Sequence, residues 1–259
     1  MITAYLRHWW RAGNAHGLHS PFVYALYTEV ICARSASEPF SGAIEQLRLQ
    51  LHHSQEAITV TDLGAGSRLT ATNVRPIRRI ARSAQKPVRY AQLLHRLVRR
   101  FRPATILELG TSLGLTTAYL AHAAAEVGNA VISFEGCPAT AAKAQQHLTD
   151  LGYDNVRIVV GNLDQTLARE VTTVSALDFV FFDANHRFQP TIAYFSTCLA
   201  KAHNDSLFIF DDIHWSDEME QAWEAIKAHP AVQVTVDLFG VGLVFFRREQ
   251  PKQHFVLRF

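Results

Sequence analysis

From residue 104 onward, short apolar runs alternate along the chain with longer stretches of helical length. The apolar runs are rich in Ile, Val, Leu and Phe and show no polar alternation, which is typical of strands buried on both faces of a sheet. The predicted strands are 104–110, 130–136, 156–162, 176–184 and 206–213, and the predicted helices are 115–128, 138–152, 163–171, 189–202 and 216–230. This alternation predicts a mostly parallel sheet with helices on both faces.

The last two apolar runs, residues 232–239 and 240–248, follow one another with only a glycine-containing turn between them. That turn is too short for a crossover, so the two runs are expected to pair as an antiparallel hairpin. The pattern therefore predicts an α/β, Rossmann-like fold with a seven-stranded, mostly parallel sheet and an antiparallel last strand. The hairpin argues against an ordinary dinucleotide-binding domain.

Residues 1–100 have a different pattern, with two or three predicted helices, an isolated strand at 57–62 and a basic helical stretch that ends at Arg102. We expect 1–100 to form a mainly helical N-terminal cap on a domain that spans 101–259. His214 and the aromatic residues Trp9, Trp10 and Trp215 are candidates for a substrate wall, although burial in the core is the interpretation we favour for the tryptophans.

Composition indicates an ordinary globular protein, since 48% of the 259 residues are hydrophobic and 19% are charged. The three cysteines, Cys32, Cys137 and Cys198, have neither the count nor the spacing of a disulfide framework or a zinc site. The chain has no signal-peptide pattern and no apolar stretch of membrane-spanning length. We therefore expect a cytoplasmic protein with no membrane partner.

The net charge of +2 conceals a basic segment, because residues 63–107 contain eleven Lys or Arg and no acid. One interpretation is a solvated helical face, and the other is a surface for an anionic partner. A nucleic-acid surface usually interleaves aromatic residues with the bases, and this segment offers only Tyr90 and Phe101. Nucleic acid is therefore not the partner we expect.

Two stretches have the form of a cofactor-binding turn, "TVTDLGAGSR" at 59–68 and "ILELGTSLGLTT" at 106–117. A nucleoside-binding turn needs a helix directly after it and an acid at the end of the next strand. The second turn meets both conditions, since the next strand ends in Glu135, which lies 25 residues beyond Gly110. The first turn meets neither, so we assign it to the cap, either as a structural turn or as a loop, 62–68, over the cleft.

With these motifs, residues 104–247 resemble the class I S-adenosylmethionine-dependent methyltransferases. The closest resemblance is to the metal-dependent catechol and caffeoyl-CoA type O-methyltransferases. Their pattern is E-x-G-x-x-x-G after the first strand, an acid after the second, F-x-D-A after the fourth and D-N after the fifth. This chain has "ELGTSLG", Glu135, "FFDA" and "FDD" at the matching places. The resemblance implies S-adenosylmethionine as cofactor, Mg²⁺ as a candidate second cofactor and a small-molecule substrate.

The resemblance also implies which residues contact S-adenosylmethionine. Glu135 would bind the ribose hydroxyls, and Asp164 would contact the adenine amine, because Leu163 departs from the polar pair that the family usually has. The full set is Lys86, Glu108, Gly110, Thr111, Ser112, Gly114, Thr116, Glu135, Gly136, Asn162, Leu163, Asp164 and Asp183.

Three acids follow the fourth and fifth strands, and carboxylate oxygens suit Mg²⁺. The resemblance implies a metal at Asp183, Asp211 and Asp212, although Asp212 replaces the family's asparagine. A metal-free relative, in which these acids orient the substrate or cap a helix, is the alternative. His186 stands where the catechol enzymes have a lysine base, so His186 and Asp183 are the candidate catalytic residues.

The leading hypothesis is O-methylation of a small hydroxylated molecule, assisted by Mg²⁺ if the acids bind it. One alternative is an RNA or protein methyltransferase that uses the basic segment 63–107. Another is a non-catalytic cofactor-binding protein. The oligomeric state is left open, with a homodimer as one option.

Overall fold

The computed structural model describes residues 2–33, 41–61 and 73–259, which form two compact units. Unit 1 consists of residues 1–34 and 171–259, and unit 2 consists of residues 35–170. Each unit combines residues from both of the regions expected from the sequence, and the division at residue 100 stays a prediction.

Unit 2 contains three parallel strands, in the order β3-β4-β5, and a separate antiparallel pair, β1-β2. Its elements are α3 (Ser41–His53), β1 (Ala57–Thr59), β2 (Val74–Pro76), α4 (Ile77–Ala84), α5 (Val88–Phe101), β3 (Ile106–Leu109), α6 (Leu115–Glu126), β4 (Val131–Glu135), α7 (Pro138–Asp150), β5 (Val156–Val160) and α8 (Leu163–Thr173). The strand expected to stand alone at 57–62 is thus one half of a pair.

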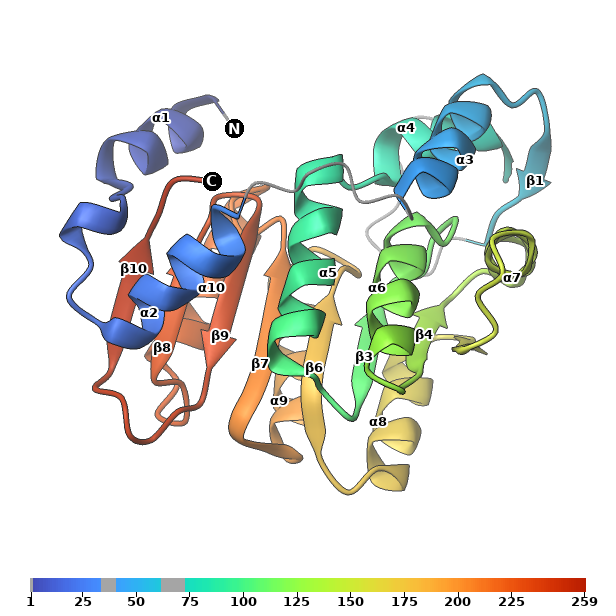
Figure 1. The fold of residues 1–259 in the computed structure, drawn as a ribbon. Helices are drawn as coiled ribbons and strands as arrows, with labels where there is room; N and C mark the ends of the chain where they lie inside the picture. The colour runs from blue at the N-terminus through green and yellow to red at the C-terminus, as the bar shows by residue number, and fades with distance from the viewer. Residues whose placement is uncertain (1, 34–40, 62–72) are drawn as a thin grey trace. The chain divides into compact units, whose positions relative to one another are not determined.

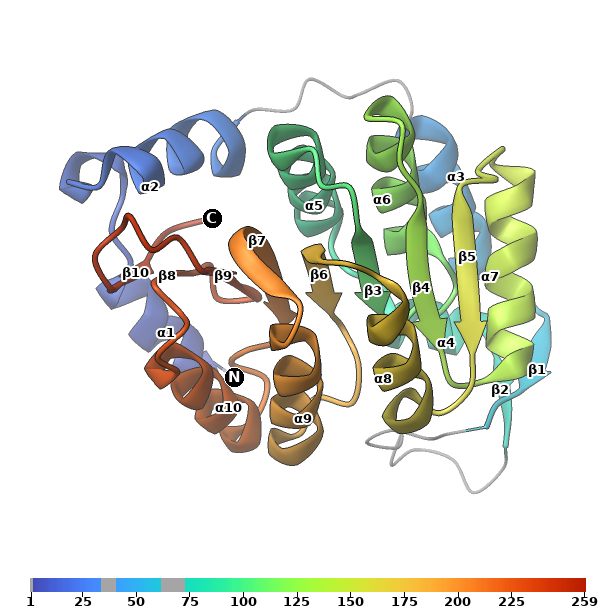
Figure 2. The same ribbon diagram turned by 90° about the horizontal axis from the view of Figure 1, so that it is seen from below.

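Helices α5 and α6 lie side by side on one face of the unit 2 strands, and α8 lies on the other face (Figures 1 and 2). Helices α5 and α6 can approach closely because the buried residues of α6 include small ones, among them Ala118, Ala121 and Ala124. Helix α5 buries Leu93, Leu97 and their neighbours and exposes arginines. This amphipathic pattern favours the solvated-face interpretation of the basic segment.

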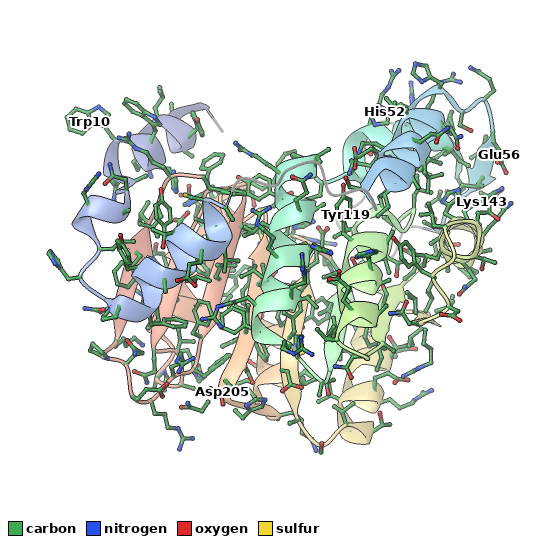
Figure 3. All side chains as sticks on the ribbon, in the orientation of Figure 1. Trp10, His52, Glu56, Tyr119, Lys143 and Asp205 are labelled. Atoms are coloured by element: carbon green, nitrogen blue, oxygen red, sulfur yellow. The ribbon has the colours of Figure 1, made fainter. Side chains whose placement is uncertain are left out.

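The residues before α5 pack onto α6 and α7 through a cluster of buried hydrophobic side chains. Two of its members, Leu113 and Leu115, flank the glycine at the start of α6. The cluster comprises Ile44, Leu51, Ile58, Ile77, Ala81, Ala91, Leu113, Leu115, Ala118, Tyr119 and Leu148. The Tyr119 hydroxyl also donates to Glu45 at 2.8 Å. Lys143 forms an ion pair with Glu56, and Figure 3 labels both of these side chains. The cap segment of unit 2 is therefore anchored beside the predicted cofactor turn.

The described residues of unit 1 form five strands in the order β10-β8-β9-β7-β6. Pairing is parallel for β6 with β7 and for β10 with β8, and antiparallel for β7 with β9 and β8 with β9. Its elements are α1 (Ile2–Arg11), η1 (Ala15–Gly17), α2 (Pro21–Leu26), η2 (Tyr27–Ile31), β6 (Leu177–Phe182), α9 (Phe188–Leu199), β7 (Ala202–Asp211), α10 (Asp217–Ala228), β8 (Val234–Asp237), β9 (Val241–Phe245) and β10 (Gln253–Val256).

The α/β class and the terminal hairpin of β8 and β9 are confirmed. The predicted seven-stranded sheet did not include β10. Residues Gln253–Val256 form a half-exposed strand without a continuous apolar run, so the pattern did not indicate it. The expected helix 189–202 ends earlier, at Leu199, because residues from Ala202 onward already belong to β7. No helix in the described part of the chain has the length and apolar character needed to cross a membrane.

Helices α2 and α10 cover opposite faces of β8 and β9 (Figures 1 and 2). On one face Phe22 of α2 meets Phe245 of β9 edge to face, with ring centroids 5.0 Å apart. On the other face the Trp223 ring of α10 lies over Gly242, where a Cβ atom would come within 2.6 Å of the indole. Because alternate strand residues face opposite sides, Phe245 and Gly242 can serve the two helices separately.

We expect Gly242→Ala to destabilise the protein by about 1–3 kcal/mol, because the new methyl group would overlap the fully buried indole of Trp223. Urea unfolding followed by Trp fluorescence measures this change. Gly17→Ala is the matched control, since a Cβ at Gly17 has no neighbour within 4 Å. Equal stability of the two variants would contradict the packing argument.

Candidate functional site

The turn between β3 and α6 is shaped by residues with left-handed backbone conformations. Gly110 has φ 113°, Ser112 has φ 49° and Gly114 has φ 83°. The N–H groups of Gly110 and Thr111 both donate to the carbonyl of Phe134, at 3.0 and 2.9 Å, which attaches the turn to β4. Glycine adopts such angles without a steric penalty, so the predicted motif has a conformational reason at Gly110 and Gly114.

Gly114 is also required by close packing. A Cβ there would lie 3.3 Å from the Cβ of Ala144 on α7. The carbonyl of the preceding residue, Leu113, accepts a hydrogen bond from the His147 ring at 3.0 Å. Helix α7 thus fixes both the position and the path of the turn.

The carboxylate of Glu135, at the end of β4, lies against this turn. Its Oε2 accepts from the Ser112 N–H at 2.9 Å, and its Oε1 accepts from the Cys137 N–H at 2.9 Å. Burial raises the pKa of the Glu135 carboxyl, and the backbone donors at Cys137, Ser112 and Gly136 only partly oppose that rise. The strand-end acid selected from the sequence is therefore beside the glycine turn, in a site rich in backbone donors.

Two of the predicted cofactor residues have side chains directed inward. Glu108 is fully buried, and its Oε2 accepts from the hydroxyls of Thr117 and Ser133, both at 2.6 Å. The Thr111 hydroxyl lies 2.6 Å from that of Ser133. These buried hydrogen bonds hold the turn against the neighbouring strand and helix. Direct contacts of Glu108 and Thr111 with the cofactor stay predictions.

The residues predicted to border adenine form the start of α8. Gly161 has φ 138° and donates its N–H to the Glu135 carbonyl at 2.9 Å. The Asn162 side chain accepts a hydrogen bond from the Asp164 N–H at 3.0 Å, which caps the helix. The Asp164 side chain is exposed. Leu163 is the first residue of α8 and is half-buried. This strand-end segment is thus linked to Glu135 through the backbone.

The remaining predicted residues of unit 2 have mixed positions. Thr116 is half-buried in the first turn of α6, and Gly136 adjoins Glu135. Lys86 is 9% exposed, and its carbonyl accepts from Arg48 at 2.9 Å. The turn 62–68, with Gly64 and Gly66, lies outside the described residues.

Cys137 was not selected from the sequence, yet it lies two residues after Glu135. Its sulfur accepts from the Thr61 N–H at 3.3 Å. Burial raises the pKa of the Cys137 thiol, but hydrogen bonds from Thr140 and from the backbone of Thr61 outweigh burial and lower it. The end of β1 is thereby placed next to the candidate cofactor site, a long-range contact that no local sequence signal could reveal.

In unit 1, the strand ends of β6 and β7 bring Asp183, His186 and Asp211 together. Their ligand atoms all lie within 4.8 Å of one another, and His186 Nε2 is 3.5 Å from Asp183 Oδ1. The cause is the parallel pairing of Phe182 with Phe210, which puts the two carboxyl ends side by side. Asp211 is 1% exposed and His186 has φ 27°, so the cluster contains a buried acid and a residue with an uncommon backbone conformation.

Asp212 is not part of this cluster among the residues that the structure describes. Its backbone has φ 52°, its N–H donates to the Gly240 carbonyl at 2.8 Å, and its carbonyl accepts from Trp215 at 2.9 Å. These contacts make Asp212 a turn residue after β7. Its role as a metal ligand stays a prediction.

Residues 107–213, which extend from β3 to the residues directly after β7, match a family described as a methyltransferase domain. This region of the chain therefore has the sequence features of a methyltransferase domain. The chain has no match among the curated protein sequences.

Solved structures agree with the methyltransferase fold. An O-methyltransferase from Bacillus cereus in complex with SAH is 19% identical, with 86% of this chain and 96% of that chain covered and a TM-score of 0.57. TomG from Streptomyces achromogenes, an O-methyltransferase of tomaymycin synthesis in complex with SAM, is 18% identical, with coverages of 87% and 96% and a TM-score of 0.58. An SAH-bound methyltransferase from Podospora anserina is 13% identical, with coverages of 89% and 97% and a TM-score of 0.60. At these identities the likeness establishes the fold.

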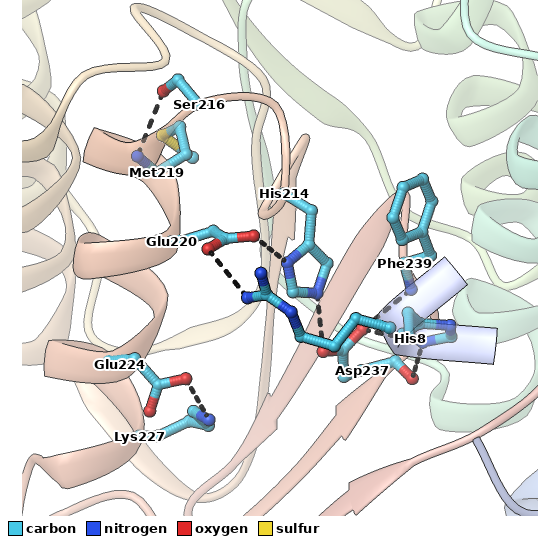
Figure 4. Close-up of polar contacts among 10 residues, drawn as sticks. His8, His214, Ser216, Met219, Glu220, Glu224, Lys227, Asp237 and Phe239 are labelled. Atoms are coloured by element: carbon cyan, nitrogen blue, oxygen red, sulfur yellow. Dashed lines mark hydrogen bonds and ion pairs between the residues drawn. The ribbon is translucent and has the colours of Figure 1, made fainter. Parts of the chain in front are cut away.

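Beyond β7, the chain has a polar network that sequence reasoning missed (Figure 4). Asp237 at the end of β8 is bonded to two imidazoles, with His214 Nε2 at 2.8 Å and His8 Nε2 at 3.1 Å. His214 Nδ1 lies 3.2 Å from Glu220 Oε1 of α10. Since both ring nitrogens of His214 face carboxylates, this side chain crosslinks α10 and β8 within unit 1 and has no ring nitrogen left for a substrate.

The charge states follow from these contacts. Burial alone would raise the pKa of the Asp237 carboxyl, but its bonds with His214 and His8 outweigh burial and lower it. Burial alone would lower the pKa of His214, but the carboxylates of Asp237 and Glu220 outweigh burial and raise it. The network is therefore an ion pair over the pH range in which His214 is protonated and Asp237 is not.

The interpretation of the tryptophans Trp9, Trp10 and Trp215 as core residues is wrong. They are 48%, 86% and 56% exposed, and Figure 3 shows Trp10 directed away from the rest of unit 1. Trp9 instead stacks on the guanidinium of Arg258 at 5.0 Å. Only tertiary packing decides which apolar positions of a short amphipathic helix are covered.

We expect Asp237→Asn to destabilise the protein by about 3 kcal/mol at pH 6, because it removes the nearer of the two carboxylate partners of a largely buried His214. The raised pKa of His214 stabilises the fold fully below its unfolded value of 6.5, and this contribution is lost as pH rises through the folded value. The lowered pKa of Asp237 stabilises the fold above 3.8. The penalty should therefore shrink between pH 6 and pH 9, as measured by urea unfolding at both values.

The control is Asp205→Asn, which changes an aspartate that is 70% exposed in the same unit. It should change stability by no more than about 0.5 kcal/mol at either pH. A penalty for Asp237→Asn that is constant with pH would show that His214 is not the charged partner.

Proposed function

We propose that this methyltransferase transfers the methyl group of S-adenosylmethionine to an oxygen of a small hydroxylated molecule. The observation that carries the proposal is the position of the Glu135 carboxylate, 2.9 Å from the backbone N–H of the left-handed Ser112. This pairs a strand-end acid with a turn rich in backbone donors, which is the combination a nucleoside ligand needs. The SAM and SAH complexes among the similar folds support it.

In the proposed complex, Glu135 accepts hydrogen bonds from the ribose hydroxyls. The turn Gly110–Gly114 approaches the methionine portion through its backbone, since the two glycines leave no side chain in the way. The start of α8 borders the adenine, where the exposed Asp164 can accept a hydrogen bond from the exocyclic amine. These roles use the residues of unit 2 alone.

The acceptor chemistry is assigned to Asp183 and His186 of unit 1. The sulfonium is already activated, so the protein needs only to align the nucleophile and remove its proton. We propose that the His186 imidazole takes the hydroxyl proton, and the oxygen then forms a bond to the methyl carbon while the carbon–sulfur bond breaks, which leaves S-adenosylhomocysteine. The Asp183 carboxylate, 3.5 Å from His186 Nε2, favours the imidazolium that results.

The donor set at these strand ends also fits a divalent cation. The oxygens of Asp183 and Asp211, within 4.8 Å of each other, suit Mg²⁺, whereas the His186 imidazole suits it less. The two aspartates would bind the ion when it is present, and Asp212 stays a candidate third ligand. A bound Mg²⁺ would lower the pKa of a coordinated substrate hydroxyl and orient it.

The remaining expectations concern partners and location. The proposed substrate is a small molecule, and we infer that the basic segment is a solvated surface, since its described arginines make contacts within unit 2, such as Arg78 with Gln55 at 2.7 Å and Arg99 with Glu126 at 3.0 Å. An RNA or protein substrate, a homodimeric assembly and a cytoplasmic location stay predictions.

Isothermal titration with S-adenosylmethionine tests the cofactor site. Glu135→Gln should weaken binding roughly ten- to hundredfold, because a charged acceptor is lost and the new amide N–H₂ group faces the N–H donors of Ser112 and Cys137. Asp150→Asn, at the exposed end of α7, is the control and should bind as the wild type does. Failure of the wild-type protein to bind S-adenosylmethionine would overturn the proposed function.

Formation of S-adenosylhomocysteine with a panel of small phenols and catechols tests the acceptor site. His186→Asn should lower kcat by roughly 10²- to 10⁴-fold with little change in cofactor affinity, because only the proton acceptor is removed. His203→Asn is the control. His203 forms a comparable pair with Asp178, at 3.0 Å, but near the amino ends of β6 and β7 and not at their carboxyl ends. Equal losses in both variants would assign His186 a structural role instead.

A further inference from the structure

A second cluster of metal-binding side chains lies in unit 2, on helices that flank β3. His95 comes from α5, and His122 and Glu126 come from α6, where their spacing of four residues puts them on one face of the helix. The ligand atoms of all three lie within 4.8 Å of one another. Helices α5 and α6 lie side by side in both views (Figures 1 and 2), so the cluster spans a helix–helix contact.

We propose that His95, His122 and Glu126 form a binding site for Zn²⁺ or a similar borderline divalent ion, which crosslinks α5 to α6. Two imidazoles with one carboxylate are a ligand set that zinc uses in proteins, with a water molecule in the fourth position. The proposal is independent of the methyl-transfer chemistry, and it involves none of the residues assigned to the cofactor or the acceptor.

The distances are close to those that coordination requires. A tetrahedral zinc ion with bonds of about 2.05 Å separates two ligand nitrogens by about 3.3 Å. His95 Nε2 and His122 Nδ1 are 3.1 Å apart, and His95 Nε2 lies 3.9 Å from Glu126 Oε2. A small rotation of the Glu126 side chain, which is 38% exposed, would bring its oxygen within range. The separation of the two imidazole nitrogens is therefore already close to the one that a zinc ion requires.

The protonation state of His95 also suits a metal ligand. Burial, with the nearby His122, Arg99 and Arg96, lowers the pKa of His95 to about 3, so this ring is neutral and able to act as a ligand at physiological pH. Arg99 Nε lies 3.0 Å from Glu126 Oε2, the position of an outer partner that orients a metal-bound carboxylate. His122 is half-buried and Glu126 is exposed, so an ion can enter from solvent.

Binding at this site should stabilise unit 2, because an ion that binds only the folded state raises the unfolding temperature. The test is thermal unfolding of the full chain after dialysis against EDTA, with Zn²⁺ added stepwise. We expect a rise in Tm that saturates near one equivalent, and an absorption band of tetrahedral Co²⁺ when cobalt replaces zinc. Mg²⁺ should produce neither effect, which separates this site from the strand-end aspartates.

His122→Ala should abolish the Zn²⁺-dependent rise in Tm and the cobalt band, and Glu126→Gln should weaken both. Glu126→Gln changes an exposed side chain, so it reports on the site even if His122→Ala unfolds the protein. His53→Ala is the matched control, since His53 is an exposed histidine of the same unit. The chain has 13 histidines, so adventitious zinc binding is a real outcome. An unchanged rise in the His122 and Glu126 variants, or no rise in the wild type, would overturn the proposal.

Discussion

The hydrogen bonds of the Glu135 carboxylate determine the geometry of the predicted cofactor region. A largely buried carboxylate is costly unless donors surround it, and here the donors are backbone N–H groups of Ser112 and Cys137. They come from the turn after β3 and from the start of α7, so one side chain at the end of β4 joins three segments. The left-handed conformation of Ser112 belongs to the same arrangement, because it directs that N–H at the acid.

The two sets of strand ends have opposite polar character. Around Glu135, unit 2 presents backbone donors and glycines, which suit a ligand with hydroxyl groups and a close approach to the main chain. Around Asp183 and Asp211, unit 1 presents acceptors and one imidazole, which suit a proton or a cation. The same topological rule explains both, since parallel neighbours bring the carboxyl ends of their strands together. What differs is the type of residue that each strand carries at or directly after its carboxyl end.

Much of the fold and part of the site could be predicted from local patterns. Continuous apolar runs identified β3 to β9, and the short glycine turn identified the hairpin of β8 and β9. The glycine motif and Glu135 were selected correctly as neighbours, because strand order and motif spacing suffice to bring them together. The edge strand β10 and the early start of β7 were missed, since half-exposed polar strands such as Gln253–Val256 carry no such signal.

The sequence by itself determined the fold class, the position of the glycine turn after β3 and the acids at the strand ends, because backbone periodicity and glycine conformation are local properties. Only the tertiary structure decided which side chains share a site. His186, rather than Asp212, joins Asp183 and Asp211, and His214 pairs with Asp237 from 23 residues away. His95 meets His122 only because two helices pack closely. Such contacts depend on register and packing between distant segments, which no local pattern encodes.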